Sequence, residues 1–178
     1  MNEINISDLD TKFKDEIAAQ PGAENFKRCF SCGTCTASCP VSEVNEEYDP
    51  RKIIRMAILG MRKEVLSSDI IWMCARCYVC YAHCPQNVKF AGVMGALREM
   101  AIAEGFAPRE RLANMDALDR FSQDLRCNLI SYLIKPEPAR KKKIETMLAT
   151  ELKQLAHRPL RSTSSTSKVD TTGARRGQ

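Results

Sequence analysis

Two runs of cysteines with identical spacing are the residues in this sequence best suited to chemistry. Both follow the pattern C-x2-C-x2-C-x3-C-P, and each cysteine of the second run lies 45 residues after its counterpart in the first. The runs use all but one of the 9 cysteines in the chain. The first run is Cys29, Cys32, Cys35 and Cys39, and the second is Cys74, Cys77, Cys80 and Cys84.

This spacing is typical of proteins that bind two [4Fe–4S] clusters. Three thiolates spaced two residues apart can wrap three corners of one cluster, and the fourth cysteine, followed by proline, binds the other cluster. We therefore expect crossed ligation and two [4Fe–4S] clusters held close together. The expected ligands are Cys29, Cys32, Cys35 and Cys84 for the first cluster, and Cys74, Cys77, Cys80 and Cys39 for the second.

Structural zinc and disulfides are the alternatives for such cysteines. Zinc sites use paired C-x2-C motifs and need nothing from a third cysteine two residues further on. The N-terminal residues are polar and acidic, unlike a secretory signal, so we expect a cytoplasmic protein in which thiols stay reduced. Two copies of the full pattern favour iron–sulfur clusters over both alternatives.

The ninth cysteine and the two histidines carry weaker signals. Cys127 falls inside an expected helix, where a lone cysteine is usually a small buried hydrophobic residue. His83 precedes Cys84, so it either tunes a cluster by hydrogen bonding or is simply solvated. His157 ends an expected helix, a common position for histidine.

The elements that must position the cysteines are predicted to be helices. Apolar spacing predicts them over residues 7–20, 90–104, 109–134 and 139–157, and Asp49-Pro50 begins another between the two runs. We also expect helices to begin just after Pro40 and Pro85. No segment shows strand alternation, so the expected fold class is all-α, a helical two-cluster module.

We expect four segments along the chain. They are an N-terminal helix and linker (1–24), a helical ferredoxin domain (25–106), C-terminal helices for packing and assembly (107–158) and a disordered tail (159–178). Apolar stripes on the C-terminal helices are expected to pack beside the cluster module and help to fix the chain in a larger assembly.

Charge and composition exclude some functions. The net charge of +5 comes largely from residues 140–143 and the last twenty residues. Aromatic residues are few and no nucleic-acid motif is present, so we expect a solvated face or a docking surface rather than nucleic-acid binding. No apolar stretch is long enough to span a membrane.

The residues around the cysteines carry a family resemblance. The segments CFSCGTCTASCPVSE, DPRKIIRMAILG and IIWMCARCYVCYAHCPQNV together resemble the C subunit of heterodisulfide reductase, over residues 25–106. The resemblance implies a helical ferredoxin fold with two [4Fe–4S] clusters. It also implies a non-catalytic relay subunit in methanogenesis, which passes electrons toward reduction of the CoM-S-S-CoB heterodisulfide.

The resemblance also implies partners. They are an A-type flavin and iron–sulfur subunit, a B-type subunit with Cys-Cys-Gly motifs and, in a wider complex, hydrogenase or formate dehydrogenase. This sequence has no adjacent cysteine pair, dinucleotide fingerprint or P-loop, which favours a relay over an enzyme. The alternatives are the equivalent subunit in bacterial sulfur or electron-bifurcating metabolism, the iron–sulfur part of a quinone-linked oxidoreductase, and a cluster-based sensor.

Overall fold

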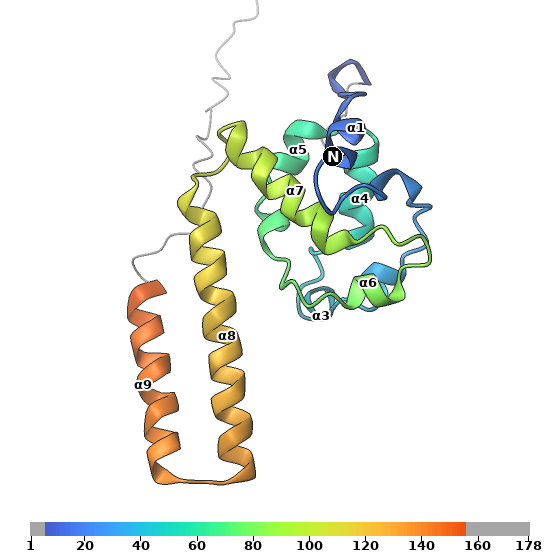
Figure 1. Ribbon diagram of the computed structural model, residues 1–178. Helices are drawn as coiled ribbons and strands as arrows, with labels where there is room; N and C mark the ends of the chain where they lie inside the picture. The colour runs from blue at the N-terminus through green and yellow to red at the C-terminus, as the bar shows by residue number, and fades with distance from the viewer. Residues whose placement is uncertain (1–5, 156–178) are drawn as a thin grey trace, which may run out of the picture.

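A computed structural model describes residues 6–155 of the chain, and within them it contains helices and no strands. The elements form a cluster-bearing module, residues 6–107, and a helical hairpin that extends from it (Figure 1). The expected all-α fold class is confirmed. The helices are η1 (Ile6–Asp8), α1 (Phe13–Ala18), η2 (Phe26–Arg28), α2 (Thr34–Ala37), α3 (Pro40–Val44), α4 (Pro50–Ile58), α5 (Arg62–Leu66), η3 (Asp69–Trp72), α6 (Val79–His83), α7 (Phe90–Ala103), α8 (Glu110–Ile134) and α9 (Pro138–Leu155).

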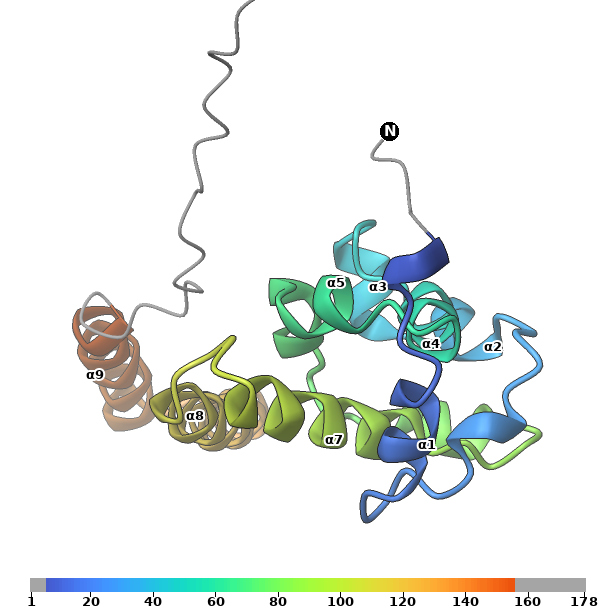
Figure 2. The same ribbon diagram turned by 90° about the horizontal axis from the view of Figure 1, so that it is seen from above.

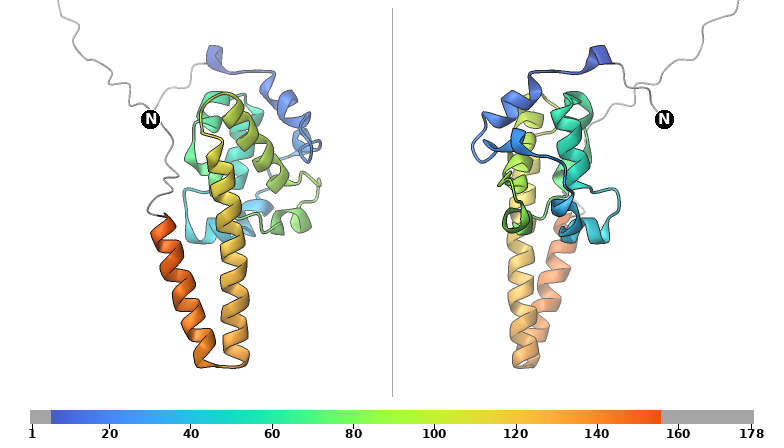
Figure 3. Two further views of the ribbon diagram at one scale, coloured as in Figure 1. Left: turned by 60° about the vertical axis from the view of Figure 1, so that its left-hand side comes forward. Right: turned by 90° about the vertical axis from the view of Figure 1, so that its right-hand side faces the viewer.

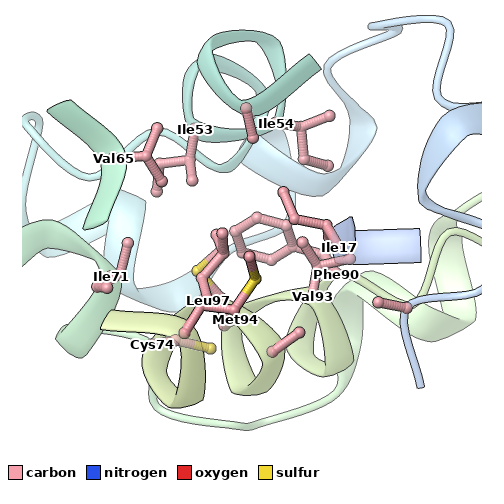
Figure 4. Close-up of a cluster of buried hydrophobic side chains, with 14 of the residues drawn as sticks. Ile17, Ile53, Ile54, Val65, Ile71, Cys74, Phe90, Val93, Met94 and Leu97 are labelled. Carbon is pink, nitrogen blue, oxygen red and sulfur yellow. The ribbon is translucent and has the colours of Figure 1, made fainter. Parts of the chain in front are cut away.

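Helix α7 is the centre of the module. Its apolar side chains recur at helical spacing, and α1, α5, α6 and η3 all pack against it. Figure 4 shows how the core forms: Val93, Met94 and Leu97 of α7 point toward Ile53 and Ile54 of α4, with Ile17 of α1 between them. In line with the apolar spacing predicted over residues 90–104, Phe90, Val93, Met94, Leu97 and Ala101 are buried. Gly105 follows the helix with a positive φ.

Helix α4 begins as the sequence predicts but ends earlier. The Asp49 carboxylate accepts a hydrogen bond from the Lys52 backbone N–H at 3.1 Å, and Pro50 takes the first turn, where its missing N–H is not needed. The apolar spacing of the sequence continues through Met61 and Val65, but the helix ends at Ile58. Gly60 has a φ of +84°, and the chain turns there before α5, although Met61 and Val65 remain buried.

Two other helix predictions need correction. The expected helix over residues 7–20 is a short turn at η1 followed by α1, because the chain between them is held by a hydrogen bond from Asp10 N–H to the Gly60 carbonyl at 2.8 Å. A helix does begin at Pro40, but none begins just after Pro85: that proline lies in a turn, and α7 starts at Phe90.

The hairpin of α8 and α9 only partly covers its own apolar stripes. α8 lies between α9 and the module (Figures 1 and 2), and its far half projects past the module (Figure 1). The two views in Figure 3 show the same projection. The expectation that the whole of 109–157 packs beside the module is therefore wrong: Met115 is buried near the start of α8, but Leu133 is 79% exposed near its end.

Two of the sequence expectations fall on residues beyond the described range. The tail at 159–178 and His157 both lie outside the described part of the chain. Within residues 6–155, no helix has both the length and the apolar character needed to cross a membrane.

Candidate iron–sulfur centre

The backbone of the two cysteine loops repeats along with their sequence spacing. In the first loop, residues 29–35, Ser31 and Gly33 have positive φ angles of 60° and 86°. In the second loop, residues 74–80, the equivalent positions are Arg76 and Tyr78, with φ angles of 49° and 60°. A positive φ after each of the first two cysteines turns the chain repeatedly, so that successive thiols point to the same side. Each loop then enters a short helix, α2 or α6, and these two helices pack against each other.

The first loop surrounds a hollow that also receives a cysteine from the second run. Its walls include Cys29, Cys32 and Cys35, and Cys84 reaches it from the end of α6. Most of the remaining wall is apolar and is formed by Ile54, Val88 and Phe90, with Arg51 at the side of Gly33. We call this space the first hollow.

The second loop surrounds an equivalent space, the second hollow. Its walls include Cys74, Cys77 and Cys80, and Cys39 reaches it from the start of α3. Its other walls come from Val41, Tyr48, Pro50, Phe90 and Ala91, with the loop's own Ala75, Tyr78 and Val79. The space around the two hollows amounts to about 380 and 320 Å³ when open solvent at their mouths is included, and the centre of a water-sized sphere can move through about 20 Å³ of each.

The two hollows are neighbours, because Cys35, Cys80 and Phe90 line both of them. Five cysteines therefore line each hollow: the three of its own loop, and the third and fourth cysteines of the other run. The structure therefore brings together all eight of the cysteines that the sequence singled out. Which four bind each cluster stays a prediction, namely Cys29, Cys32, Cys35 and Cys84 for one and Cys74, Cys77, Cys80 and Cys39 for the other.

The middle cysteine of each loop marks where its hollow meets the surface. Cys32 and Cys77 are exposed, and the other six range from partly to fully buried. Exposed aromatic side chains lie beside both: Phe30 is 60% exposed and Tyr78 is 54% exposed. One edge of each hollow is therefore within reach of another protein.

Hydrogen bonds and burial set the acidity of the thiols. The Thr34 hydroxyl and backbone N–H, with a smaller contribution from the charge of Arg51, lower the pKa of Cys32. Burial raises the pKa of Cys35 to about 11, and burial also raises the pKa of Cys80. Because iron binds thiolates, loading of the inner cysteines must release protons.

Backbone amides also face the sulfurs. The N–H of Ser31 donates to the Cys29 sulfur at 3.4 Å, and the N–H of Val88 donates to the Cys84 sulfur at 3.4 Å. Amide donors of this kind stabilise negative charge on cysteine sulfur, and they are one of the factors that set cluster potentials.

Three arginines that sequence reasoning overlooked hold the second loop in place. Arg98 of α7, only 2% exposed, donates to the carbonyl oxygens of Ile71 at 2.8 Å and Cys74 at 3.1 Å. Arg111 of α8 lies over the Trp72 ring, with its guanidinium carbon 5.1 Å from the ring centre. The sequence could have indicated a structural role for Arg98, since it is the one basic residue within the apolar sequence of α7.

The third arginine, Arg76, joins the second loop to the hairpin. Its guanidinium forms ion pairs with two carboxylates of α8: Asp116 at 2.6 Å, and Asp119, to which the Arg76 Nε also donates at 2.8 Å. Arg76 lies between Cys74 and Cys77, so the first half of α8 contacts the loop that carries the second set of thiols.

The donors fit iron–sulfur clusters. Within residues 6–155, no group of three His, Cys, Asp or Glu side chains converges as binding of a single metal ion would require. The thiols instead surround two spaces, as a ligand of several atoms needs. The second hollow is also lined by Tyr48, whose buried hydroxyl makes no well-formed hydrogen bond in this part of the chain.

The other sequence candidates are not part of these hollows. The prediction that Cys127 is buried is wrong: it is exposed on α8, in the half that projects past the module. His83 is exposed at the end of α6, in agreement with the solvated alternative.

Comparison with known proteins identifies the cluster-bearing part. A family model described as a 4Fe-4S dicluster domain matches residues 25–88, which contain both loops and all eight cysteines. Residues 25–88 are therefore similar to 4Fe-4S dicluster domains. The expected cofactors, two [4Fe–4S] clusters, are confirmed by this match.

Named relatives cover a longer stretch of this dicluster protein. It is 40% identical over 105 residues to the C subunit of the H(2):CoB-CoM heterodisulfide,ferredoxin reductase of Methanothermobacter thermautotrophicus, over 59% of this chain and 56% of the relative. It is 46% identical over 89 residues to the C2 subunit of the H(2)/formate:CoB-CoM heterodisulfide,ferredoxin reductase of Methanococcus maripaludis, over 50% and 47% of the two chains.

A third relative has a less specific name. The chain is 38% identical over 92 residues to a protein of Archaeoglobus profundus named as being like the C subunit of heterodisulfide reductase, over 52% of this chain and 48% of the relative. The resemblance to the C subunit of heterodisulfide reductase is thus confirmed. The matched region spans about half the length of these relatives.

Proposed function

We propose that this dicluster protein is the non-catalytic electron-relay subunit of a heterodisulfide reductase complex. It would pass electrons from an A-type flavin and iron–sulfur subunit to a B-type subunit that reduces the CoM-S-S-CoB heterodisulfide. The observation that carries the proposal is the pair of adjoining hollows, which share Cys35 and Cys80 and each meet the surface at a different cysteine. The names of the relatives support the choice of complex.

The protein's part in this function is to hold, insulate and expose two redox sites. Each [4Fe–4S] cluster, when bound, supplies a centre that accepts and releases one electron. Phe90 and the shared cysteines separate the two hollows by a single layer of side chains, a short distance for electron tunnelling. Apolar side chains such as Ile54 and Val41 keep water from the inner walls. Cys32 and Cys77 leave one edge of each hollow open to a partner.

The grooves beside the two hollows differ in charge. Three cations, Arg51, Lys52 and Arg55, and one carboxylate, Asp49, line a groove beside the first hollow, next to Leu59, which is 50% exposed. Among the described residues, the groove beside Cys39 at the second hollow is lined by a single charged side chain, the carboxylate of Glu43. This difference supports two docking faces for two different partners, with an acidic partner surface beside the first hollow.

The hairpin supports assembly in a complex. Six large apolar side chains on it are exposed: Leu129, Ile130, Leu133, Ile134, Leu148 and Leu152. Exposed apolar surface on this scale usually marks an interface. We propose that a subunit of the same complex covers this part of the hairpin, and that Arg76, Asp116 and Asp119 fix the angle at which it projects.

The names of the relatives point to a wider complex. H2 appears in the names of two of them and formate in one of these, which supports hydrogenase or formate dehydrogenase as a source of electrons. The far end of the hairpin projects past the module that carries both hollows (Figure 1), so a partner could bind there without blocking electron transfer.

The test is anaerobic purification of the chain from its native source under gentle conditions. We expect a flavoprotein and a Cys-Cys-Gly protein to co-purify, and reduced complex to reoxidise with CoM-S-S-CoB. Reoxidation by another disulfide or sulfur compound, with CoM-S-S-CoB inert, would assign the chain to the bacterial type of complex instead. A stable monomer with both clusters intact would overturn the proposal.

A matched pair of variants tests the hairpin. Leu133→Glu places a charge in the exposed apolar stripe, and Asp124→Asn changes an exposed polar residue of the same helix. We expect the first to reduce the amount of co-purified partner at least several-fold, and the second to leave it unchanged. Equal recovery of partners with both variants would show that the hairpin is not the interface.

A further inference from the structure

The Tyr48 hydroxyl is a buried polar group whose role the relay function does not explain. Tyr48 lies between α3 and α4 and is 1% exposed. Within residues 6–155 its hydroxyl makes no well-formed hydrogen bond, although the Cys74 thiol lies near enough to interact with it. Buried hydroxyls without partners are uncommon in folded proteins, and each one calls for an explanation such as a bound group.

The position of Tyr48 is fixed by its backbone. Its N–H donates to the Asn45 carbonyl at 3.1 Å, and its carbonyl accepts from the Ser42 hydroxyl at 2.7 Å. The next two residues, Asp49 and Pro50, begin α4. The backbone that carries the ring is therefore held in place, and the side chain is buried.

Tyr48 belongs to the wall of the second hollow. Tyr48 lines it together with Cys39 and Cys74, while Val41, Pro50 and Phe90 supply nearby apolar wall. These neighbours offer a phenol no strong oxygen acceptor. The acceptors within the hollow are sulfur atoms, which can accept weak hydrogen bonds.

The first hollow has no counterpart to this residue among the described side chains. Its inner wall is formed by Ile54, Val88 and Phe90. Two hydroxyl residues also line it: Thr34, which pairs with the exposed Cys32 at 3.3 Å, and Ser31, which is partly exposed in the loop rather than buried like Tyr48. The two halves repeat in their cysteine loops but differ at this point. The difference would act on one cluster and not on the other.

We propose that the Tyr48 hydroxyl donates a hydrogen bond to sulfur of the second cluster or of its Cys74 ligand, and so raises the reduction potential of that cluster alone. The proposal rests on the proposed relay function and places Tyr48 as a tuning residue, without a covalent or proton-transfer role. The ordinary pKa of a tyrosine phenol is near 10. The phenol therefore remains a donor at neutral pH.

The direction and size of the effect follow from charge. Reduction adds one electron to the cluster, which increases negative charge on its sulfurs and strengthens a hydrogen bond to them. A net contribution typical of one hydrogen bond favours the reduced form about fivefold. For a one-electron couple, at 59 mV per tenfold, this is about 40 mV.

The experiment compares Tyr48→Phe with Tyr132→Phe, a tyrosine on α8 that lines neither hollow. Both variants are loaded anaerobically and titrated with dithionite, and each cluster is followed by EPR. The signal of the second cluster is identified by its change in a Cys77→Ser variant. We expect Tyr48→Phe to lower the potential of the second cluster by about 40 mV and to leave the first unchanged. Tyr132→Phe should change neither.

Several outcomes would overturn the proposal. Unchanged potentials in Tyr48→Phe, or equal shifts of both clusters, would show that the hydroxyl does not act on the second cluster. Either result would leave the relay function standing, because both clusters would still be present. Absence of both clusters from the wild-type chain on metal and sulfide analysis would instead remove the proposed function.

A second measurement applies if Tyr48→Phe fails to load its second cluster. In a chain with Tyr78→Phe, Tyr81→Phe and Tyr132→Phe, Tyr48 is the one remaining tyrosine of the 4. Replacing it with 3-fluorotyrosine keeps the hydroxyl and makes it a stronger donor. The potential of the second cluster should then rise relative to the same chain with ordinary tyrosine. No rise would contradict the proposal.

Discussion

Two glycines of helix α7 should respond in opposite ways to the same substitution. Gly92 and Gly95 both lie inside the helix, where alanine is preferred over glycine by about 0.5–1 kcal/mol. At Gly95, an added Cβ would meet nothing within 4 Å. At Gly92, the same atom would lie 2.2 Å from the Gly22 carbonyl oxygen and 3.0 Å from the Tyr81 hydroxyl.

The contact at Gly92 sets the size of the effect. Ordinary contacts between heavy atoms are near 3.5–4.0 Å, so the backbone at Gly22 must move by about 1 Å or more. Overpacking of this kind typically costs about 1–3 kcal/mol, which exceeds the gain in helix propensity. We expect Gly92→Ala to lower the free energy of unfolding by about 1–2 kcal/mol, and Gly95→Ala to raise it by about 0.5–1 kcal/mol.

Guanidinium unfolding of the loaded protein measures the free energy of unfolding of both variants. The unfolding is followed anaerobically by circular dichroism and by the visible absorption of the clusters. The segment at Gly22 leads through Phe26 to Cys29, so Gly92→Ala should also speed the release of iron to a chelator. If both variants were stabilised by the same amount, the close packing of residue 22 on α7 would be refuted.

Two further predictions concern charges near the hollows. Arg51→Gln should lower the reduction potential of the first cluster by about 20–40 mV, because it removes a positive charge beside Gly33; this corresponds to roughly a two- to fivefold change in the one-electron equilibrium. Redox titration in low salt and in about 0.5 M salt measures the shift. A shift that does not shrink with salt would contradict an electrostatic cause. Asp119→Asn should cost about 1 kcal/mol of stability and speed iron release from the second cluster, because it removes one of the two carboxylates that hold Arg76. Asp124→Asn, on the same helix, is the control, and equal iron release from both variants would show that the ion pair does not stabilise the loop.

Local patterns in the sequence are enough to predict the helices and the cysteine loops. The Asp49-Pro50 cap, the apolar spacing of α7 and the length of α8 all depend on residues close in sequence, and the sequence predicts all three. Where long-range contacts decide the structure, prediction fails. The early end of α4 depends on Gly60, whose carbonyl accepts from Asp10 some fifty residues earlier, and the burial expected for Cys127 fails because α8 projects past the module.

The site shows the same division. The repeated spacing identifies all eight cysteines, since the ligand pattern is local to each loop. It does not identify the arginines that brace the second loop, because Arg76, Arg98 and Arg111 act on partners that are 24–43 residues away in sequence. Tyr48 escapes prediction for a similar reason: only the fold places it in the wall of the second hollow.

The most direct test of the central claim is the effect of Cys84→Ser on the two clusters. The claim is that each cluster is held by three cysteines of one run and the last cysteine of the other, in two adjoining hollows. EPR and iron analysis of Cys84→Ser, with Cys127→Ala as the control, should show the cluster of Cys29, Cys32 and Cys35 altered or lost and the other intact. The control should keep about eight iron and eight sulfide per chain, as two complete clusters require. Loss confined to the cluster of Cys74, Cys77 and Cys80 would contradict the crossed arrangement.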